Sequence, residues 1–271
     1  MSSAIELLFL GTGTSAGVPM IGCHCDVCSS ADPRDKRTRC SAVISYGGHS
    51  VLVDTSPELR LQAVANNVNR IDAVVFTHAH ADHIMGLDDV RRFNTIKGGP
   101  LDVFADAHTN RVLQTCFAYA FQEPKAEWKL FRPHLKPHVI HGPFDLLGQT
   151  WTPVELIHGE VNVLGFRVGD LAYCTDVSEL PAESFKLLRG LDVLVLDALQ
   201  EKKHPTHLTI DEALAVIDEL NPRETWLTHM SHQVMHAIAD AKLPARVKLA
   251  YDGLRVSTHA GLQSDTAALR Q

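Results

Sequence analysis

The sequence predicts an α/β fold, and two observations support this class. Short apolar runs with strand character alternate with segments of helical spacing along the whole chain. The composition, with 45% hydrophobic and 21% charged residues in 271, is that of a globular protein with enough apolar side chains for a sizeable core. No internal repeat, low-complexity tract or linker interrupts the alternation, so one domain over residues 1–271 is the simplest prediction.

The first part of the chain is predicted to contain strands separated by short helices. Residues 5–10 form a strand that leads into a Gly-rich loop, and residues 41–46 and 49–54 flank Gly47-Gly48 as a hairpin. Residues 57–67 have helical spacing, with Leu59, Ala63 and Val64 as the expected buried face. Further strands are expected at residues 71–76 and 101–105, and a helix at residues 110–121.

The second part is predicted to contain more strands and one well-bounded helix. The region 122–143 is rich in Pro, Lys and His and is expected to be dominated by loops that shape a pocket. The expected helix at residues 210–220 has Thr209 at its start and Asn221-Pro222 at its end. Strands are expected at residues 154–157, 165–168, 171–174, 191–196 and 224–227.

The charge balance limits the partners. With 25 basic and 32 acidic residues the formal net charge is −7, which disfavours a stable complex with nucleic acid. The start of the chain lacks the basic region of a signal peptide, and no run approaches the roughly 18 apolar residues of a membrane span. We therefore expect a cytoplasmic protein with no membrane partner, in which the six cysteines are thiols or metal ligands.

The segment His78-Ala-His-Ala-Asp-His83 carries most of the functional inference. The chain has 16 histidines, and imidazole is the commonest neutral metal ligand. In an extended stretch His78 and His80 face the same way, and a helix starting near Asp82 would turn Asp82 and His83 toward a second spot. Four ligand-type residues directly after a strand suit a pair of metal ions. A solvated His-rich loop is the alternative, and the completeness of the string disfavours it.

This string resembles the defining motif of the metallo-β-lactamase superfamily. The resemblance implies the αββα four-layer sandwich of that superfamily, with two central mixed sheets flanked by helices. It also implies that the remaining ligands follow later strands, and the candidates are His158, Asp176 and His229. By the same resemblance one metal would be held by His78, His80 and His158, the other by Asp82, His83 and His229, with Asp176 bridging and Asp54 orienting ligands from behind.

The other histidines lack a matching context. A surface or loop position is predicted for most of them, and His49 and His204 stay open, with a structural role favoured. The surface or loop group comprises His108, His134, His138, His141, His236 and His259.

A second metal site is predicted from Cys23, Cys25 and Cys28. Three thiols in the pattern C-x-C-x₂-C suit a closed tetrahedral zinc site that needs a fourth ligand. His232, three residues after His229, is our choice, with His24 and Cys40 as competitors. Three reduced loop cysteines are the alternative. Cys116 and Cys174 lie in apolar contexts and are expected in the core.

Nearly the whole chain resembles PhnP-type phosphodiesterases of the carbon–phosphorus lyase pathway. The features that match are Gly11-Thr-Gly-Thr-Ser-Ala-Gly-Val-Pro19, the cysteine loop, the His/Asp string and Thr228-His-Met-Ser-His232. That family places an additional histidine near the scissile phosphate, and His207 matches its position. A role in fixing the start of the following helix is the alternative for His207.

The resemblance implies a binuclear enzyme for a small phosphodiester. Two divalent ions, manganese or zinc, would activate a water, with Asp176 bridging them and Asp82 accepting a hydrogen bond from the nucleophile. His207 would either stabilise charge on the phosphate oxygens or protonate the leaving group. Cyclic ribose phosphates and 2′,3′-cyclic nucleotides fit as substrates, and a homodimer is consistent with the family. The alternatives are a tRNA 3′-processing nuclease, a pyrroloquinoline-quinone biosynthesis protein, a thioesterase or lactamase, and a non-catalytic zinc module, which would predict missing ligands.

Overall fold

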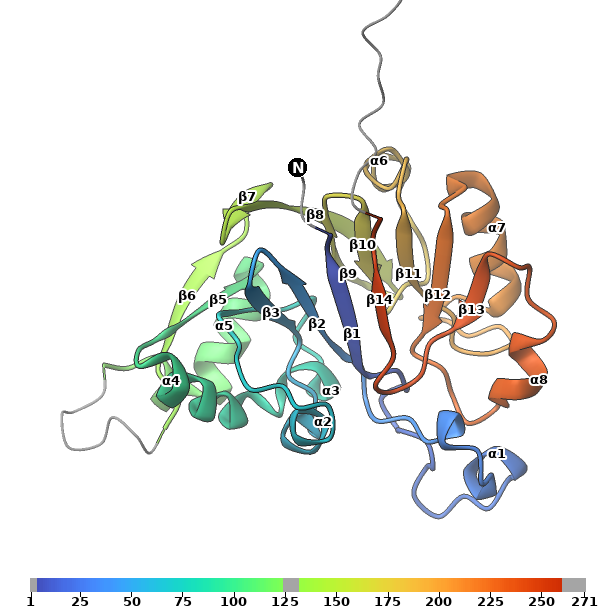
Figure 1. The fold of residues 1–271 in the computed structure, drawn as a ribbon, viewed down its shortest axis with the longest axis horizontal. Helices are drawn as coiled ribbons and strands as arrows, with labels where there is room; N and C mark the ends of the chain where they lie inside the picture. The colour runs from blue at the N-terminus through green and yellow to red at the C-terminus, as the bar shows by residue number, and fades with distance from the viewer. Residues whose placement is uncertain (1–3, 124–131, 260–271) are drawn as a thin grey trace, which may run out of the picture.

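The computed structural model describes residues 4–123 and 132–259, which form two seven-stranded sheets (Figure 1). The first sheet has the order β14 (Arg255–Ser257), β1 (Glu6–Gly11), β2 (Ser41–Tyr46), β3 (His49–Val53), β4 (Ala73–Val75), β5 (Leu101–Ala105) and β6 (Leu135–Val139). The second has the order β13 (Val247–Leu249), β12 (Glu224–Thr228), β11 (Val193–Asp197), β10 (Leu171–Cys174), β9 (Val161–Val168), β8 (Gln149–His158) and β7 (Phe144–Leu146).

Each sheet combines a parallel and an antiparallel part. Strands β3 to β6 run parallel in the first sheet, and β10 to β13 run parallel in the second. The remaining neighbours pair antiparallel. The carboxyl ends of parallel strands share one edge of a sheet, so each sheet offers a row of strand ends where functional side chains can gather.

Helices cover the outer face of each sheet, while the short helix at residues 26–29 lies apart from both sheets (Figure 1). In chain order they are α1 (Asp26–Ser29), α2 (Leu59–Ala65), α3 (Ala81–Ile84), α4 (Arg91–Lys97), α5 (Ala107–Cys116), α6 (Ala182–Leu187), α7 (Ile210–Leu220) and α8 (His236–Asp240). Helices α4 and α5 lie outside the first sheet, and α7 and α8 lie outside the second. The predicted αββα sandwich is confirmed by this arrangement.

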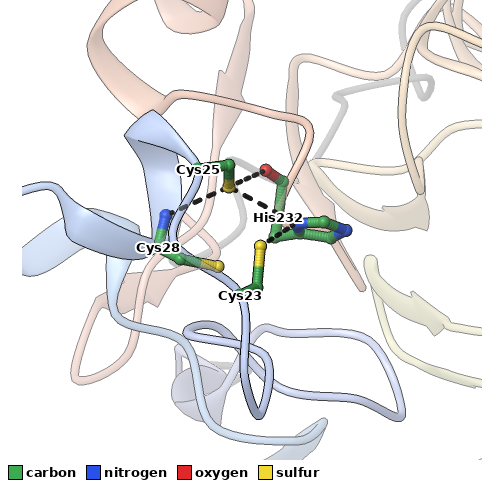
Figure 2. A group of neighbouring side chains, drawn as sticks. All are labelled: Cys23, Cys25, Cys28 and His232. Carbon is green, nitrogen blue, oxygen red and sulfur yellow. Dashed lines mark hydrogen bonds between the residues drawn. The ribbon is translucent and has the colours of Figure 1, made fainter.

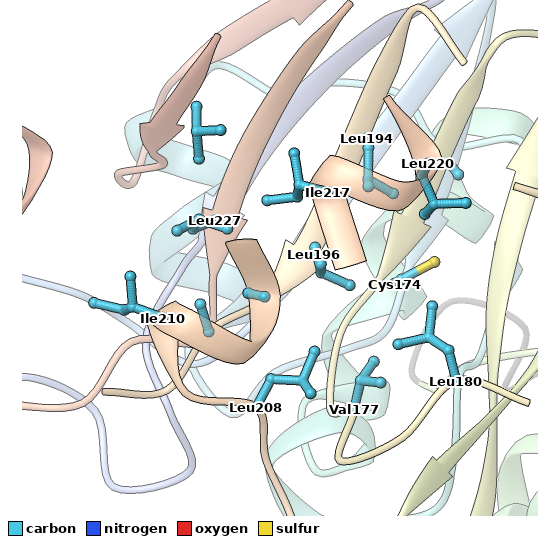
Figure 3. Close-up of a cluster of buried hydrophobic side chains, with 14 of the residues drawn as sticks. Cys174, Val177, Leu180, Leu194, Leu196, Leu208, Ile210, Ile217, Leu220 and Leu227 are labelled. Atoms are coloured by element: carbon cyan, nitrogen blue, oxygen red, sulfur yellow. The ribbon is translucent and has the colours of Figure 1, made fainter. Parts of the chain in front are cut away.

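Three apolar layers hold the sandwich together. In β11 the side chains of Val193 and Val195 point into the core between the sheets, while Leu194 and Leu196 point outward. There they meet α7, whose Ile210, Ile217 and Leu220 complete the outer layer (Figure 3). A matching layer lies between the first sheet and its helices. Both faces of each central strand are therefore buried, which explains the continuous apolar runs in the sequence.

The best-predicted elements are those with their own boundary signals. Strand β10 and helix α7 have the predicted bounds. The side chain of Thr209 accepts a hydrogen bond from the backbone N–H of Glu212 at 3.1 Å, and the Glu212 carboxylate accepts one from the Thr209 N–H at 2.9 Å. Asn221 ends the helix in the left-handed region, with φ 50°. These reciprocal contacts satisfy backbone groups at the helix ends.

The predicted buried face of α2 was partly wrong. Leu59 and Ala63 are buried, but Val64 is 69% exposed and Gln62 is buried instead. The Gln62 amide donates to Thr38 Oγ1 at 2.8 Å and to the Arg39 carbonyl at 2.9 Å. The polar side chain is buried because the chain segment beside it supplies acceptors, which helical spacing does not reveal.

Two further predictions need correction. The loop-dominated region 122–143 contains the strand β6, although residues 124–131 lie outside the described residues. Pro137 in this strand is tolerated because β6 is the edge of its sheet. Strands β7, β13 and β14 were not predicted either; each has three residues, too few for a periodic signal.

At the end of β1 and in the Gly-rich loop that follows, the backbone lies very close to the segment around Arg39. A Cβ at Gly11 would lie 2.1 Å from the carbonyl oxygen of Arg39, so no side chain fits there. The loop then pairs with the segment after β12, where the Met230 N–H donates to the Thr12 carbonyl at 3.0 Å. Within the described residues, none of the helices is both long and apolar enough to cross a bilayer.

Candidate metal centre

The predicted ligands meet at the ends of strands from both sheets. His78, His80, Asp82 and His83 come after β4, where the short helix α3 begins at Ala81. From the second sheet, His158 ends β8, Asp176 follows β10 and His229 directly follows β12. The helix start turns Asp82 and His83 away from the extended residues before it, as the sequence suggested.

Three residues at the centre have left-handed backbone conformations. Asp54 has φ 60°, Asp176 has φ 59° and His229 has φ 64°. Asp and His tolerate this region better than most side chains, but the conformation still costs free energy. Each residue sits where a strand ends and the chain must turn sharply, so the strain aims a functional side chain at the common centre.

Asp176 lies between two groups of nitrogen and oxygen donors. Its Oδ1 is 4.0 Å from His78 Nε2 and 3.9 Å from His158 Nε2. Its Oδ2 is 3.2 Å from His83 Nε2 and 3.3 Å from His229 Nδ1. One carboxylate oxygen therefore faces each group, which is the geometry expected of a bridging ligand.

The two groups have the size of metal sites. The donor atoms of His78, His80 and His158 all lie within 4.8 Å of one another. The donor atoms of Asp82, Asp176 and His229 do so too. His83 joins the second group, since its Nε2 lies 3.4 Å from Asp82 Oδ2. The structure thus brings together all seven residues that the sequence proposed as catalytic metal ligands.

Hydrogen bonds at the rear fix the tautomers of three histidines. The Nδ1 of His158 is 2.6 Å from the Thr206 carbonyl, which can only accept, so Nδ1 carries the proton. His83 Nδ1 lies 2.7 Å from Asp54 Oδ2 in the same way. His78 Nδ1 lies 2.9 Å from Thr77 Oγ1, whose hydroxyl donates to Asp54. In each case the Nε2 lone pair is left facing the centre, as metal binding requires.

Unpartnered buried nitrogens and the charge states also fit bound cations. His78 Nε2, His83 Nε2 and His229 Nδ1 are buried without a hydrogen-bond partner, a costly state that a metal ion would relieve. Burial lowers the pKa of His78 and of His229, which favours the neutral, metal-binding form, whereas at His83 the carboxylates of Asp176 and Asp54 outweigh burial and raise the pKa. Burial would raise the pKa of Asp176, but His229 and His83 hold it well below its usual range. The residues present therefore fit a binuclear divalent cation site.

His207 lies directly beside this centre, with a ring nitrogen within 4.8 Å of donor atoms of His158 and Asp176, and is held by Asp197. The His207 ring is 4.6 Å from the rings of His158 and His229, measured between centroids. Its Nδ1 lies 3.0 Å from Asp197 Oδ2. Burial acts to lower the pKa of His207, but Asp197 outweighs it and the pKa is raised. Since Leu208 separates His207 from the cap of α7, His207 is not the residue that fixes the helix start.

Sequence reasoning missed Asp197. A usable signal was present, because Val195-Leu-Asp197 repeats the pattern of Leu52-Val-Asp54, where an apolar strand ends in a carboxylate. Asp197 is fully buried, and it also accepts a hydrogen bond from the backbone N–H of Val177 at 3.0 Å. It therefore positions His207 from behind, as Asp54 positions His83.

The cysteine loop meets His232 as predicted (Figure 2). The Sγ atoms of Cys23 and Cys25 each lie 3.4 Å from His232 Nδ1, and Cys28 Sγ completes a group within 4.8 Å. Hydrogen bonds from the Cys28 backbone N–H and from His232 lower the pKa of Cys25 to about 6, which favours the thiolate that binds zinc. Of the two competitors, His24 is exposed, and Cys40 lies 3.6 Å from Thr228 Oγ1 instead.

Two side chains lie where the sequence did not place them. Cys116, expected in the core, is exposed at the end of α5, whereas Cys174 is buried as expected. His236, expected at the surface, is only 2% exposed because its Nδ1 lies 3.0 Å from the buried guanidinium of Arg37. The other histidines predicted for the surface are not buried, and His49 lies beside Asp72, away from the metal centre.

Comparisons with known proteins show the family of the chain. The family model of the beta-lactamase superfamily domain matches residues 49–230. The crystal structure of a diphosphatase from the PhnP family is 44% identical, with a TM-score of 0.87 over 95% of this chain and 98% of that one. The fold and the donor set define a metal-dependent hydrolase of the metallo-β-lactamase superfamily. Within that superfamily the chain belongs to the PhnP family, as the sequence motifs indicated.

Two curated relatives with other activities also match the chain. An octanoyltransferase from Porphyromonas gingivalis is 36% identical over 255 residues, which is 92% of this chain and 51% of that protein. The chain therefore spans about half the length of this relative. A ribonuclease Z from Clostridium kluyveri is 24% identical over 261 residues, covering 75% of this chain and 86% of that protein.

Proposed function

We propose that the chain is a binuclear phosphodiesterase for small substrates such as cyclic ribose phosphates or 2′,3′-cyclic nucleotides. The observation that carries this proposal is the position of His207, held by Asp197 and 4.6 Å from His158 and His229 between ring centroids. A proton donor at the border of a binuclear centre suits a reaction in which an alkoxide leaves a phosphorus atom.

The proposed cofactors are two catalytic divalent cations, manganese or zinc, and one structural zinc. His/Asp donors admit either metal at the catalytic centre, while three thiols and an imidazole favour zinc at the cysteine cluster. The cysteine cluster and the centre share one segment, because His229 and His232 are three residues apart. Zinc at the cluster would therefore fix the segment that presents His229.

The mechanism assigns a role to each group of the chain. Two divalent cations, when bound, acidify a shared water and neutralise charge on the phosphoryl oxygens. In hydrolysis the water oxygen bonds to phosphorus while the bond from phosphorus to the leaving oxygen breaks. Asp82, which lies in the group with Asp176 and His229, would accept a hydrogen bond from the nucleophile. His207, whose pKa Asp197 raises against the effect of burial, would give a proton to the leaving oxygen.

A phosphoric anhydride is the second candidate substrate. The 44% identical PhnP-family relative is a diphosphatase, and the same groups would serve both reactions. In an anhydride the leaving group is a phosphate, which needs less protonation than an alkoxide. The relative rates of hydrolysis of a phosphodiester and a phosphoric anhydride therefore depend on the residues around the leaving group.

A substrate panel tests the proposed function. Metal-reconstituted protein is assayed with bis-p-nitrophenyl phosphate, an octanoyl thioester and a β-lactam, and its metal content is measured. We expect hydrolysis of the phosphodiester alone, with two catalytic cations and one zinc per chain. Asp176→Ala, which removes the bridging carboxylate, is the inactive control. Turnover of the thioester or the lactam, with none of the phosphodiester, would overturn the proposal and favour an acyl substrate.

A further inference from the structure

The loop that precedes His207 is fixed against the metal centre. It runs from Glu201 to Thr206, and its base is closed by a hydrogen bond from the Ile210 N–H to the Gln200 carbonyl at 3.0 Å. The Thr206 carbonyl accepts the hydrogen bond from His158 Nδ1. A Cβ at Gly159 would lie 2.7 Å from Thr206 Cγ2, so the loop packs directly on the turn between β8 and β9. The loop is therefore part of the wall of the site.

His204 of this loop stands next to His207. Its ring centroid is 5.3 Å from that of His207, whose other neighbours are His158 and His229. Among the ring contacts of the described residues, His204 has none with a predicted metal ligand. The side chain is half-buried, so it is open to a bound substrate.

The orientation of His204 makes it a donor. Its Nδ1 accepts a hydrogen bond from the Thr206 backbone N–H at 3.4 Å, and Thr206 Oγ1 lies 3.2 Å from the same nitrogen. Because Nδ1 is an acceptor, the proton of the neutral ring is on Nε2. The loop uses Nδ1 for its own structure and leaves the Nε2–H without a partner in the described residues.

We propose that His204 is a substrate-binding residue that donates through Nε2 to a second phosphoryl group, adjacent to the one that reacts. This inference rests on the second candidate of the proposed function, hydrolysis of a phosphoric anhydride. In this proposal His207 contacts the reacting phosphoryl group. The His204 ring is the neighbour of the His207 ring in the wall of the site. A group covalently attached to the reacting phosphorus through the leaving oxygen would come within reach of it.

The charges of the loop identify that group as anionic. Lys202 and Lys203 precede His204, in a chain whose net charge is −7. Lys203 pairs with Glu212, and Glu201 pairs with Lys242 at 3.7 Å, while Lys202 is exposed and has no ion pair among residues 4–123 and 132–259. The loop therefore carries a lysine without an ion pair among the described residues, two positions before the imidazole donor. A neutral sugar hydroxyl would not need this cation, whereas a second phosphoryl group would.

Two substrates that differ in the second phosphoryl group test the proposal. Metal-loaded wild type, His204→Ala and His204→Gln are assayed with diadenosine diphosphate and with bis-p-nitrophenyl phosphate. We expect His204→Ala to lower kcat/KM for the diphosphate about tenfold more than for the diester, mainly through KM, as for one lost hydrogen bond to a charged group. His204→Gln, which keeps an N–H donor, should recover most of the loss. His108→Ala, on the exposed face of α5, is the matched control.

Binding and stability measurements separate a contact from a structural role. The non-hydrolysable methylene analogue of the diphosphate should bind His204→Ala about tenfold more weakly than wild type in calorimetry, at unchanged metal content and Tm. Equal losses on both substrates, or no loss on either, would overturn the proposal for His204. Wild type that hydrolyses only the diester would also overturn it while leaving the proposed function intact. Failure of both phosphorus substrates would instead refute the proposed function.

Discussion

Two strands, one in each sheet, end in a carboxylate that holds a histidine. Asp54 follows β3 and lies 2.7 Å from His83 Nδ1, while Asp197 ends β11 and lies 3.0 Å from His207 Nδ1. Both carboxylates are fully buried, and both histidines come from other segments of the chain. The local construction of the two pairs is therefore the same.

The pairs differ in what the far side of each imidazole meets. His83 is fully buried, and its Nε2 lies 3.2 Å from Asp176 Oδ2 within the cluster of candidate ligands. The His207 side chain keeps 9% exposure at the border of that cluster. The same carboxylate–imidazole contact thus orients a metal ligand in one sheet and a proton donor in the other. The surroundings of the free nitrogen, and not the pair itself, decide the role.

The largest expected effect separates the two histidines directly. His207→Ala should lower kcat by about 10²–10⁴-fold, because the leaving group loses its proton donor. Its catalytic metal content should equal that of wild type, whereas His83→Ala should lose one cation per chain. Metal analysis of the purified variants beside steady-state kinetics measures both. A loss of metal from His207→Ala would make His207 a ligand and remove the distinction.

The next effect compares the two carboxylates. Asp54→Asn should weaken binding of the catalytic metals by about 10–100-fold, because His83 and Thr77 lose the acceptor behind the ligands. Asp197→Asn should leave metal affinity within about twofold and lower kcat by about tenfold, through misorientation of His207. Metal titration against a competing chelator gives the affinities. Equal metal affinities in the two variants would contradict the division of roles.

A smaller effect comes from a third buried histidine that faces a cation. Burial, with Arg37 beside it, lowers the pKa of His236 to about 4, whereas in the unfolded chain the pKa is near 6.5. The unfolded state therefore takes up a proton first, and stability is lost as the pH falls from about 6.5 to about 4. Because the two pKa values differ by about 2.5, His236→Gln should lose about 2–3 kcal/mol less than wild type over this interval.

Chemical denaturation at pH 7 and at pH 4.5 measures this difference. His108→Gln, at an exposed position, controls for the removal of a histidine that has no buried cation beside it. The proton uptake of all other groups is common to the variants and cancels in the comparison. If His236→Gln and wild type lost the same stability, the contact with Arg37 would not govern the state of this imidazole.

The sequence by itself determined the features whose information is local. The spacing of His78, His80, Asp82 and His83 predicted the convergence on one centre, and boundary residues defined α7 within its observed bounds. Asp176 became a candidate because its position after a predicted strand matched the order of ligands that the superfamily resemblance implies. These signals survive because chain geometry alone relates residues a few positions apart.

Only the tertiary structure decided the contacts between distant segments. Asp197 Oδ2 contacts His207 Nδ1, and the Arg37 guanidinium contacts the buried His236. The buried Gln62 amide donates to Thr38 Oγ1, while Val64 is exposed. Each of these side chains is polar, and its burial is stable only because a partner from another element satisfies it. The identity of that partner depends on how the sheets and loops pack. The periodicity of the sequence therefore does not predict which polar side chains are buried.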